Sequence, residues 1–163
     1  AIMVTNSEKL ANLVSDEVER QLSQLPRESI ARPAIENNSY IAVMDSVEDM
    51  FTVMNEVAPE HLEIQLPDPM EYMSMVENAG SVFLGRYASE PLGDYVGGTN
   101  HVLPTSGTAK FSSPLGVYDF VKRISFTQFS RERLQEVAKD ITTLARTEGL
   151  EAHARAIEVR FED

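Results

Sequence analysis

The feature that most constrains the fold of this chain is a fourfold alternation of short apolar runs and helical patterns within its first 85 residues. The apolar runs are residues 1–4, 40–43, 62–66 and 81–84. The helical patterns between them cover residues 7–25, 28–36, 46–57 and 69–76. Each apolar run has the length of a buried strand. Strands that alternate with helices are usually parallel and joined by right-handed crossovers, so the pattern predicts an α/β domain with a parallel sheet.

Two of the predicted helices carry specific sequence signals, one inside the helix and one at its start. Residues 28–36 form the weaker pattern, which we expect to be interrupted at Pro33 because proline lacks an amide hydrogen. Asp45, followed three residues later by Glu48, offers a capping box for a helix over residues 46–57.

Composition excludes several classes of function. The 163 residues are 42% hydrophobic and 25% charged, which is ordinary for a globular protein. The chain has no cysteine, which excludes disulfides and sulfur-ligated metals. Its net charge of -12 would repel nucleic acid. No apolar run approaches the ~20 residues of a membrane span, and the first residues lack a signal-peptide pattern. We therefore expect a cytoplasmic protein with no nucleic-acid and no membrane partner.

The distribution of charge suggests two domains. Residues 1–109 hold 17 acidic and 5 basic residues, whereas residues 110–163 hold 9 of each. The change falls in a segment rich in Ser, Thr, Gly and Pro, so we predict domains at 1–110 and 111–163. In the second region Ser130 caps a long helix that Gly149 ends. One long helix buries little by itself, so we expect this region to pack on a partner.

The segment 93–105, GDYVGGTNHVLPT, combines three glycines with a carboxylate, an amide and an imidazole. It has no helical or alternating period, so we expect a loop. It follows the fourth predicted strand, and ligands of parallel sheets bind beyond the carboxyl ends of strands. Asp94 and His101 are groups that hold zinc or orient a polar substrate. A surface turn whose Asp and Asn bind local backbone is the alternative.

The three histidines of the chain are His61, His101 and His153. His61 follows Glu60, and an adjacent Glu-His pair can act in acid/base catalysis, although a solvated strand end is the alternative. His153 taken alone is typical of a surface histidine. Asp94 with any of these histidines falls short of the three protein ligands of a catalytic zinc site.

Several segments together strongly resemble the C-terminal part of histidinol dehydrogenase. They are VERQL (18–22), APEHL (58–62), AGSVFLG (79–85), the whole 93–105 segment and LEAH (150–153). The resemblance runs through essentially all 163 residues. It implies an α/β fold with an incomplete, parallel Rossmann-like sheet and a small, mainly helical C-terminal domain that is swapped onto a partner subunit.

The resemblance also implies an activity. Members of this family are NAD-dependent oxidoreductases that convert L-histidinol to L-histidine through the aldehyde, the last step of histidine biosynthesis, with zinc in the site. By this resemblance Glu60 and His61 are the acid/base pair. His61 takes protons during the hydride transfers and also contacts the substrate, and Glu60 activates the water that attacks the aldehyde.

The other site residues likewise rest on the resemblance. Asp94 and His153 resemble zinc ligands that also contact the substrate, and His153 would reach the zinc of the neighbouring subunit in a homodimer with a shared active site. His101 and Glu148 resemble further contacts to L-histidinol. No NAD-binding residue of the family has a counterpart among these residues.

The family differs from this chain in length. Its members are more than twice as long, and the preceding half supplies a Gln and a His as the other zinc ligands, together with the nucleotide site. We therefore expect a C-terminal fragment that is inactive alone and that self-associates to hide its cut edge. A non-catalytic dimerisation or regulatory module that keeps the fold is the alternative. An independent zinc hydrolase would need a third nearby ligand.

Overall fold

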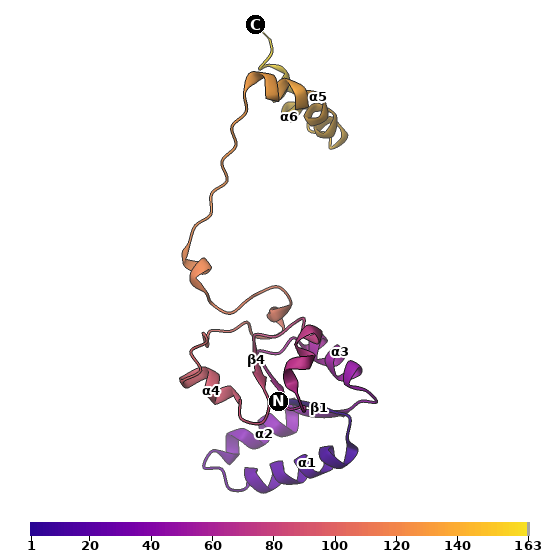
Figure 1. Cartoon of the computed structure of the whole chain (residues 1–163), viewed down its shortest axis with the longest axis vertical. Helices are drawn as coiled ribbons and strands as arrows, with labels where there is room; N and C mark the ends of the chain where they lie inside the picture. The colour runs from indigo at the N-terminus through magenta and orange to yellow at the C-terminus, as the bar shows by residue number, and fades with distance from the viewer. Residues whose placement is uncertain (163) are drawn as a thin grey trace. The chain divides into compact units, whose positions relative to one another are not determined.

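The computed structural model describes residues 1–162, which form two compact units divided after Val121 (Figure 1). The first unit contains β1 (Ile2–Thr5), α1 (Glu8–Leu22), α2 (Glu28–Asn38), β2 (Tyr40–Val43), α3 (Val47–Val57), β3 (His61–Ile64), η1 (Pro69–Met75), β4 (Ser81–Leu84), α4 (Glu90–Tyr95), η2 (Thr108–Lys110) and η3 (Val117–Phe120). The second contains α5 (Arg131–Thr147) and α6 (Glu151–Glu158). No helix in the part of the chain that the structure describes is both long and apolar enough to cross a bilayer. The expected division at 110/111 and the domain swap stay predictions.

The strands are parallel, as the strand-helix alternation predicted, but among residues 1–162 they form two separate pairs. β1 pairs with β2 from Ile2↔Tyr40 to Thr5↔Val43. β3 pairs with β4 from His61↔Ser81 to Ile64↔Leu84. The expectation of one sheet is wrong for these residues, because a hollow of about 1010 Å³ lined by both β1 and β3 separates the pairs.

The core of the first unit lies between α3 and the second strand pair. Phe51, Met54 and Ile64 are its buried residues, and the rings of Phe51 and Tyr72 stack at 5.8 Å. Since side chains alternate along a strand, β3 and β4 have two distinct faces. Leu62, Ile64, Val82 and Leu84 pack against the core. His61, Glu63 and Phe83 lie on the opposite face, which carries the candidate site.

The cap of α3 lies one residue later than predicted. Ser46, not Asp45, occupies the N-cap, and its hydroxyl accepts a hydrogen bond from the Asp49 amide at 3.1 Å. The same hydroxyl donates to the Asp49 carboxylate at 2.6 Å. Ser46, and not Asp45, caps the helix because the Ser46 hydroxyl reaches the amide of the third helical residue. The predicted Asp45 and Glu48 capping box is therefore wrong.

Helix α2 continues through Pro33, where an interruption was expected. Pro33 removes one backbone hydrogen bond, but the helix is bridged across this position by the side chain of Arg32. The Arg32 guanidinium lies 2.8 Å from Glu28 and 3.5 Å from Glu36, which are one turn before it and one turn after it. These two pairs hold the turns on both sides of the proline together.

The second unit is a helix pair. Ser130 caps α5 as predicted, accepting from the Arg133 amide at 3.1 Å. Gly149, with φ of +74°, reverses the chain between α5 and α6. Ala145 and Ala154 are buried between the helices. Residues 122–130 that precede α5 have no regular structure and are exposed.

Candidate active site

The Glu60-His61 pair lies where α3 ends and β3 begins. Ala58 is fully buried in a left-handed conformation and turns the chain from the helix into the strand. The Ser81 amide then donates to the Glu60 carbonyl at 2.9 Å. This approach requires Gly80, because a Cβ there would lie 2.6 Å from the Glu60 carbonyl oxygen. The two strand starts are therefore held against each other by the APEH and AGS segments.

The two functional groups of this pair face each other. The Glu60 Oε1 lies 3.6 Å from the His61 Nε2, with 39% and 27% of the respective side chains exposed. Both groups are accessible to a ligand, and the distance is within the range that tightens to a hydrogen bond once a substrate is present. The pair can therefore accept, hold and release a proton.

The imidazole of His61 is held by its surroundings on one side only. Its ring stacks on the buried Phe83 ring at a centroid distance of 6.0 Å. Its Nδ1 atom is buried and has no hydrogen-bond partner among residues 1–162. Leaving such a group unpaired costs about 1–3 kcal/mol.

Asp94 lies on α4, which corrects the expectation that the whole 93–105 segment is a loop. Residues 93–95 complete the helix, and irregular structure begins at Val96. The sequence signal for this helix is Pro91 in its first turn after Ser89 at the N-cap position. Gly93 is required for packing: a Cβ there would lie 2.8 Å from two atoms of the Phe83 ring. The helix therefore sits directly on the residue that supports His61.

Glu90 joins these groups and was missed in the sequence. A hydrogen bond with Asp94 raises the pKa of the Glu90 carboxyl, with partial desolvation and the charge of Asp94 acting in the same direction. The charge of His61 lowers this pKa and that of Glu63 raises it. The Glu90 amide also donates to the Glu63 carboxylate at 3.1 Å. The spacing of Glu90 and Asp94, one helical turn, would have revealed the pair had α4 been recognised.

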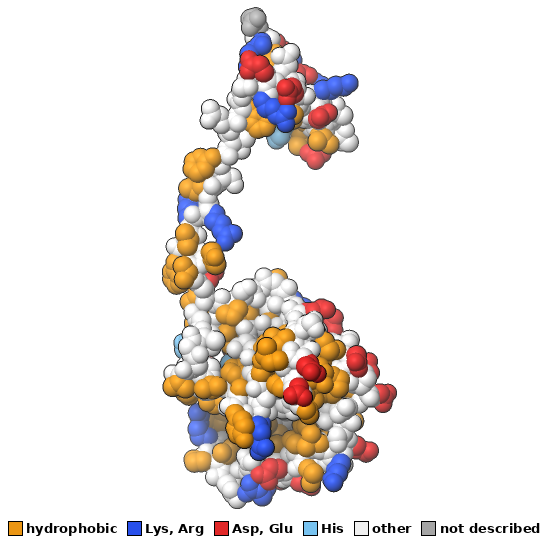
Figure 2. Space-filling view, in the orientation of Figure 1, with side chains coloured by type: hydrophobic (Ala, Val, Ile, Leu, Met, Phe, Trp, Pro, Cys, Tyr) orange, Lys and Arg blue, Asp and Glu red, His pale blue; other side chains and the backbone are white. Residues whose placement is uncertain are grey.

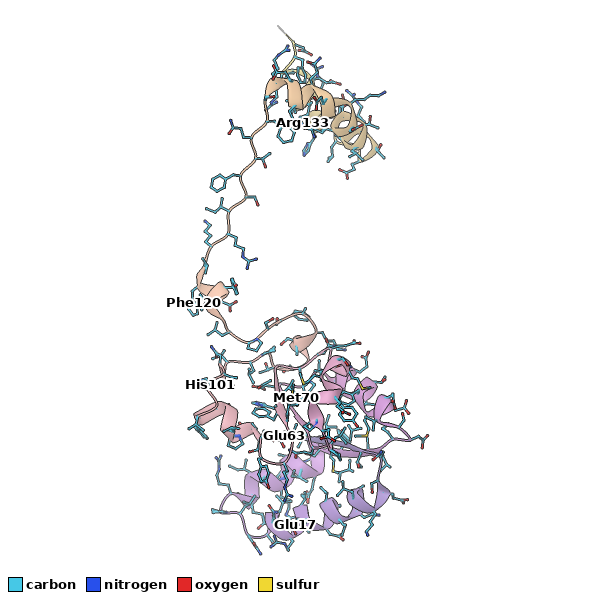
Figure 3. The ribbon with its side chains drawn as sticks, viewed as in Figure 1. Glu17, Glu63, Met70, His101, Phe120 and Arg133 are labelled. Carbon is cyan, nitrogen blue, oxygen red and sulfur yellow. The ribbon has the colours of Figure 1, made fainter. Side chains whose placement is uncertain are left out.

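The structure brings some predicted site residues together and leaves others apart. Glu60, His61 and Asp94 belong to one region of the first unit, connected through Glu90. The side chain of His101 is exposed on the irregular segment after α4 (Figure 3). Glu148 and His153 are exposed in the second unit, at the end of α5 and on α6. His61 begins β3, in agreement with the expectation that the Glu-His pair lies at the start of a strand.

The described residues do not by themselves form a zinc site. No three His, Cys, Asp or Glu side chains gather as metal ligands anywhere in residues 1–162. Asp94 and His153, the two expected ligands, belong to different units. Since a catalytic zinc needs three protein ligands, this donor set does not fit the metal without groups from elsewhere.

Parallel strands that carry an accessible Glu-His pair next to paired carboxylates are typical of an enzyme that transfers protons. The family model for histidinol dehydrogenase matches residues 1–161, and the chain belongs to the histidinol dehydrogenase family.

Relatives of known name agree with this assignment. Histidinol dehydrogenase of Lactiplantibacillus plantarum is 63% identical over 161 residues, which are 99% of this chain and 38% of the relative. That of Streptococcus mutans is 61% identical over 160 residues, 98% of this chain and 38% of the relative. The crystal structure of the Elizabethkingia anophelis enzyme superposes with a TM-score of 0.79 at 38% identity, covering 99% of this chain and 37% of that one. The chain thus spans just over a third of these proteins.

Proposed function

We propose that this chain supplies the proton-transfer residues of an NAD- and zinc-dependent histidinol dehydrogenase that oxidises L-histidinol to L-histidine through the aldehyde. The observation that carries the proposal is the accessible Glu60-His61 pair at 3.6 Å, next to Asp94 and Glu90, in a chain of this family. Its operation in the cytoplasm, as part of histidine biosynthesis, stays a prediction.

The proton steps follow from the geometry. In the first oxidation the Nε2 of His61 takes the hydroxyl proton of the alcohol as hydride leaves the carbon that becomes the aldehyde. Nε2 suits this role because the other ring nitrogen is buried. Glu60 then takes a proton from the water that adds to the aldehyde carbon. His61 returns its proton to the aldehyde oxygen as the water adds, so it can take a hydroxyl proton of the resulting hydrate during the second hydride loss. The carboxylic acid that forms then ionises to the carboxylate.

Zinc and NAD belong to the whole protein in this proposal. Two molecules of NAD, bound in turn, would each supply the acceptor for one hydride, at a site that we place outside these residues. Asp94, with His153 from a partner subunit, would hold zinc only together with ligands that these residues do not supply. His101 and Glu148 would contact the substrate. We therefore propose that the 163 residues alone are inactive.

A homodimer with a shared site is supported by the segment 117–129. Its hydrophobic side chains are unusually exposed, with Phe120 at 80% and Phe126 at 90% (Figure 2). Aromatic side chains this exposed are stabilised when a partner covers them. A swapped second unit would bring Glu148 and His153 to the site of the neighbouring subunit.

The test uses a chimera in which this chain replaces the matching 161 residues of the L. plantarum enzyme. We expect the chimera to reduce NAD with L-histidinol. His61→Asn should lower kcat by about 100- to 10,000-fold, the usual contribution of an acid/base group. Glu60→Gln should release the aldehyde intermediate, because water addition is slowed. The control Glu56→Gln alters an exposed carboxylate on α3 and should leave kcat unchanged.

Two results would contradict the proposal. A folded, dimeric chimera without activity would favour the non-catalytic dimerisation module. NADH formation by the pure 163-residue chain would show that the proposed dependence on outside ligands and nucleotide site is wrong.

A further inference from the structure

Asn55 ties the end of α3 to the segment that leads into β4. It lies in the last turn of the helix and is half-buried. Its side-chain nitrogen donates to the Met75 carbonyl at 2.9 Å, and its side-chain oxygen accepts from the amides of Glu77 and Asn78 at 2.9 and 3.2 Å. The Asn78 side chain in turn donates to the Asn55 backbone carbonyl at 3.1 Å. Four hydrogen bonds therefore join residues that are 20 to 23 positions apart in the sequence.

The segment that Asn55 holds has no regular structure of its own. Residues 76–80, between η1 and β4, form neither helix nor strand. Backbone groups in such a segment find their partners among side chains or water. Asparagine suits this position because its side chain presents a donor and an acceptor in one plane, so that it bonds a carbonyl and two amides at once. Aspartate would lack the donor, and alanine would lack both groups.

The hydrogen bonds continue from this segment to the Glu60-His61 pair. The Gly80 amide donates to the Pro59 carbonyl at 2.9 Å. The Ser81 amide donates to the Glu60 carbonyl, also at 2.9 Å. These carbonyls belong to the peptide units on either side of the Glu60 Cα, the second of which contains the His61 nitrogen. Because each peptide unit is planar, fixing both of them fixes φ and ψ of Glu60, and with them the direction of its Cα–Cβ bond.

The contacts form a closed path. It crosses from Asn55 to the segment before β4, follows that segment to Ser81, and crosses back to Glu60, from which the chain returns to Asn55. Ala58 lies on the returning chain, fully buried in a left-handed conformation. On the other side a Cβ at Gly80 would lie 2.6 Å from the Glu60 carbonyl oxygen. The two segments are closely packed and cannot slide against each other unless hydrogen bonds break.

We propose that Asn55 is a positioning residue for Glu60 and His61. Its hydrogen bonds hold the backbone from which both side chains project, and so keep the Glu60 Oε1 opposite the His61 Nε2 at 3.6 Å. Catalytic geometry of this kind must be held to within about 0.5 Å. Within the part of the chain that the structure describes, the Asn55 side chain bonds to residues 75–78 and to none of the candidate site residues. The inference rests on the proposed function, because it assumes that the pair transfers protons.

The path holds Glu60 more directly than His61, because both of the bonded carbonyls flank the Glu60 Cα. Loss of the Asn55 side chain should therefore disturb the step that we assign to Glu60, the addition of water to the aldehyde. An enzyme in which this step is slow releases part of the aldehyde before it is oxidised. The ratio of aldehyde released to L-histidine formed does not depend on how many enzyme molecules are folded. It therefore separates a positioning role from a loss of stability.

The first experiment measures this ratio in the chimera with the L. plantarum enzyme. Asn55→Ala should raise the ratio and lower kcat for L-histidinol by about 10- to 100-fold, since a displacement of about 1 Å costs about 100-fold. The KM for L-histidinol should change little, and the zinc content should stay the same, because Asp94 and His153 do not belong to the path. Asn55→Asp keeps the two accepted hydrogen bonds and should give intermediate values. It also carries the test if Asn55→Ala does not fold.

A second readout does not depend on activity. In the folded chimera the Gly80 and Ser81 amides should exchange with solvent about tenfold faster once Asn55 is replaced by alanine, because the hydrogen bonds that hold the preceding segment are lost. The matched control is Asn37→Ala. Asn37 also lies in the last turn of its helix, α2, and its side chain donates to the Pro33 carbonyl at 2.8 Å. This variant should change neither the amide exchange nor the aldehyde ratio.

Two results would overturn the inference. One is an unchanged aldehyde ratio in a folded, active Asn55→Ala chimera, and the other is equal amide exchange at Gly80 and Ser81 in the Asn55→Ala and Asn37→Ala chimeras. Failure of the proposed function gives a different result, a chimera that is folded but inactive without any substitution. The amide exchange alone would then decide whether Asn55 holds the two strand starts.

Discussion

For Gly93→Ala, helix propensity and packing predict changes of opposite sign in the free energy of unfolding. Gly93 lies within α4, and replacing a helical glycine by alanine ordinarily stabilises by about 1 kcal/mol. Here the new Cβ would lie 2.8 Å from the Cε1 and Cζ atoms of Phe83, whereas carbon atoms pack at about 3.5–4.0 Å. The Phe83 ring is buried and stacked on His61, so it has little room to move.

The packing effect should prevail. Forcing a methyl group into a filled site costs about 1–3 kcal/mol. Subtracting the helix gain of about 1 kcal/mol leaves a net destabilisation of about 1 kcal/mol, or a fall of roughly 2–4 °C in Tm for a chain of this size. Urea and thermal unfolding followed by circular dichroism would measure it. Gly116→Ala, where the nearest atom to a new Cβ lies at 3.8 Å, is the neutral control.

A second background tests the cause. Phe83→Leu removes both of the ring atoms that the new Cβ would meet, so Gly93→Ala should become stabilising in that background, with a coupling free energy of about 2 kcal/mol. Stabilisation of the native background by Gly93→Ala, or the same effect with and without Phe83, would refute the contact between α4 and the histidine support.

Three further predictions concern the first unit. Ser46→Ala should lower the free energy of unfolding by about 1 kcal/mol through loss of the α3 cap, whereas Asp45→Ala should leave it unchanged. If urea unfolding showed equal effects for the two variants, Ser46 would not be the cap. Arg32→Met should lower Tm more than Arg20→Met, because Arg32 joins α2 to Glu19 of α1 while Arg20 pairs within its helix; the difference should shrink at high salt. The hydrogen bond from Arg20, aided by Gln21, lowers the pKa of Glu17 from 4.5 to about 2. A depressed carboxyl pKa stabilises the folded state above 4.5 and loses this effect as the pH falls toward 2, so Glu17→Gln should lower Tm at neutral pH but not near pH 2.

The sequence predicted the elements of the fold better than their assembly. The runs 40–43 and 81–84 are β2 and β4 to the residue, because their length of four residues suits a buried strand and is too short for a helix. Strand pairing was beyond reach because it depends on which edges meet in space. The split into two pairs reflects a space between β1 and β3 that no local pattern encodes.

The candidate site, like the fold, was only partly predictable from the sequence. Glu60 and His61 were recognisable from adjacency and resemblance, and Asp94 from the resemblance. Glu90 was not, because its role depends on a six-residue helix that a glycine-rich pattern conceals. The support from Phe83 required knowing that Gly93 brings α4 onto the ring.

The surroundings of His61 add a second reason for the proposed inactivity of the 163 residues alone. Its Nδ1 is buried without a hydrogen-bond partner among residues 1–162, and its ring is stacked on Phe83 on one side only. Positions of this kind must be held to within about 0.5 Å for efficient proton transfer. Inactivity of the 163 residues alone would then have two causes, the missing ligands and an unrestrained base.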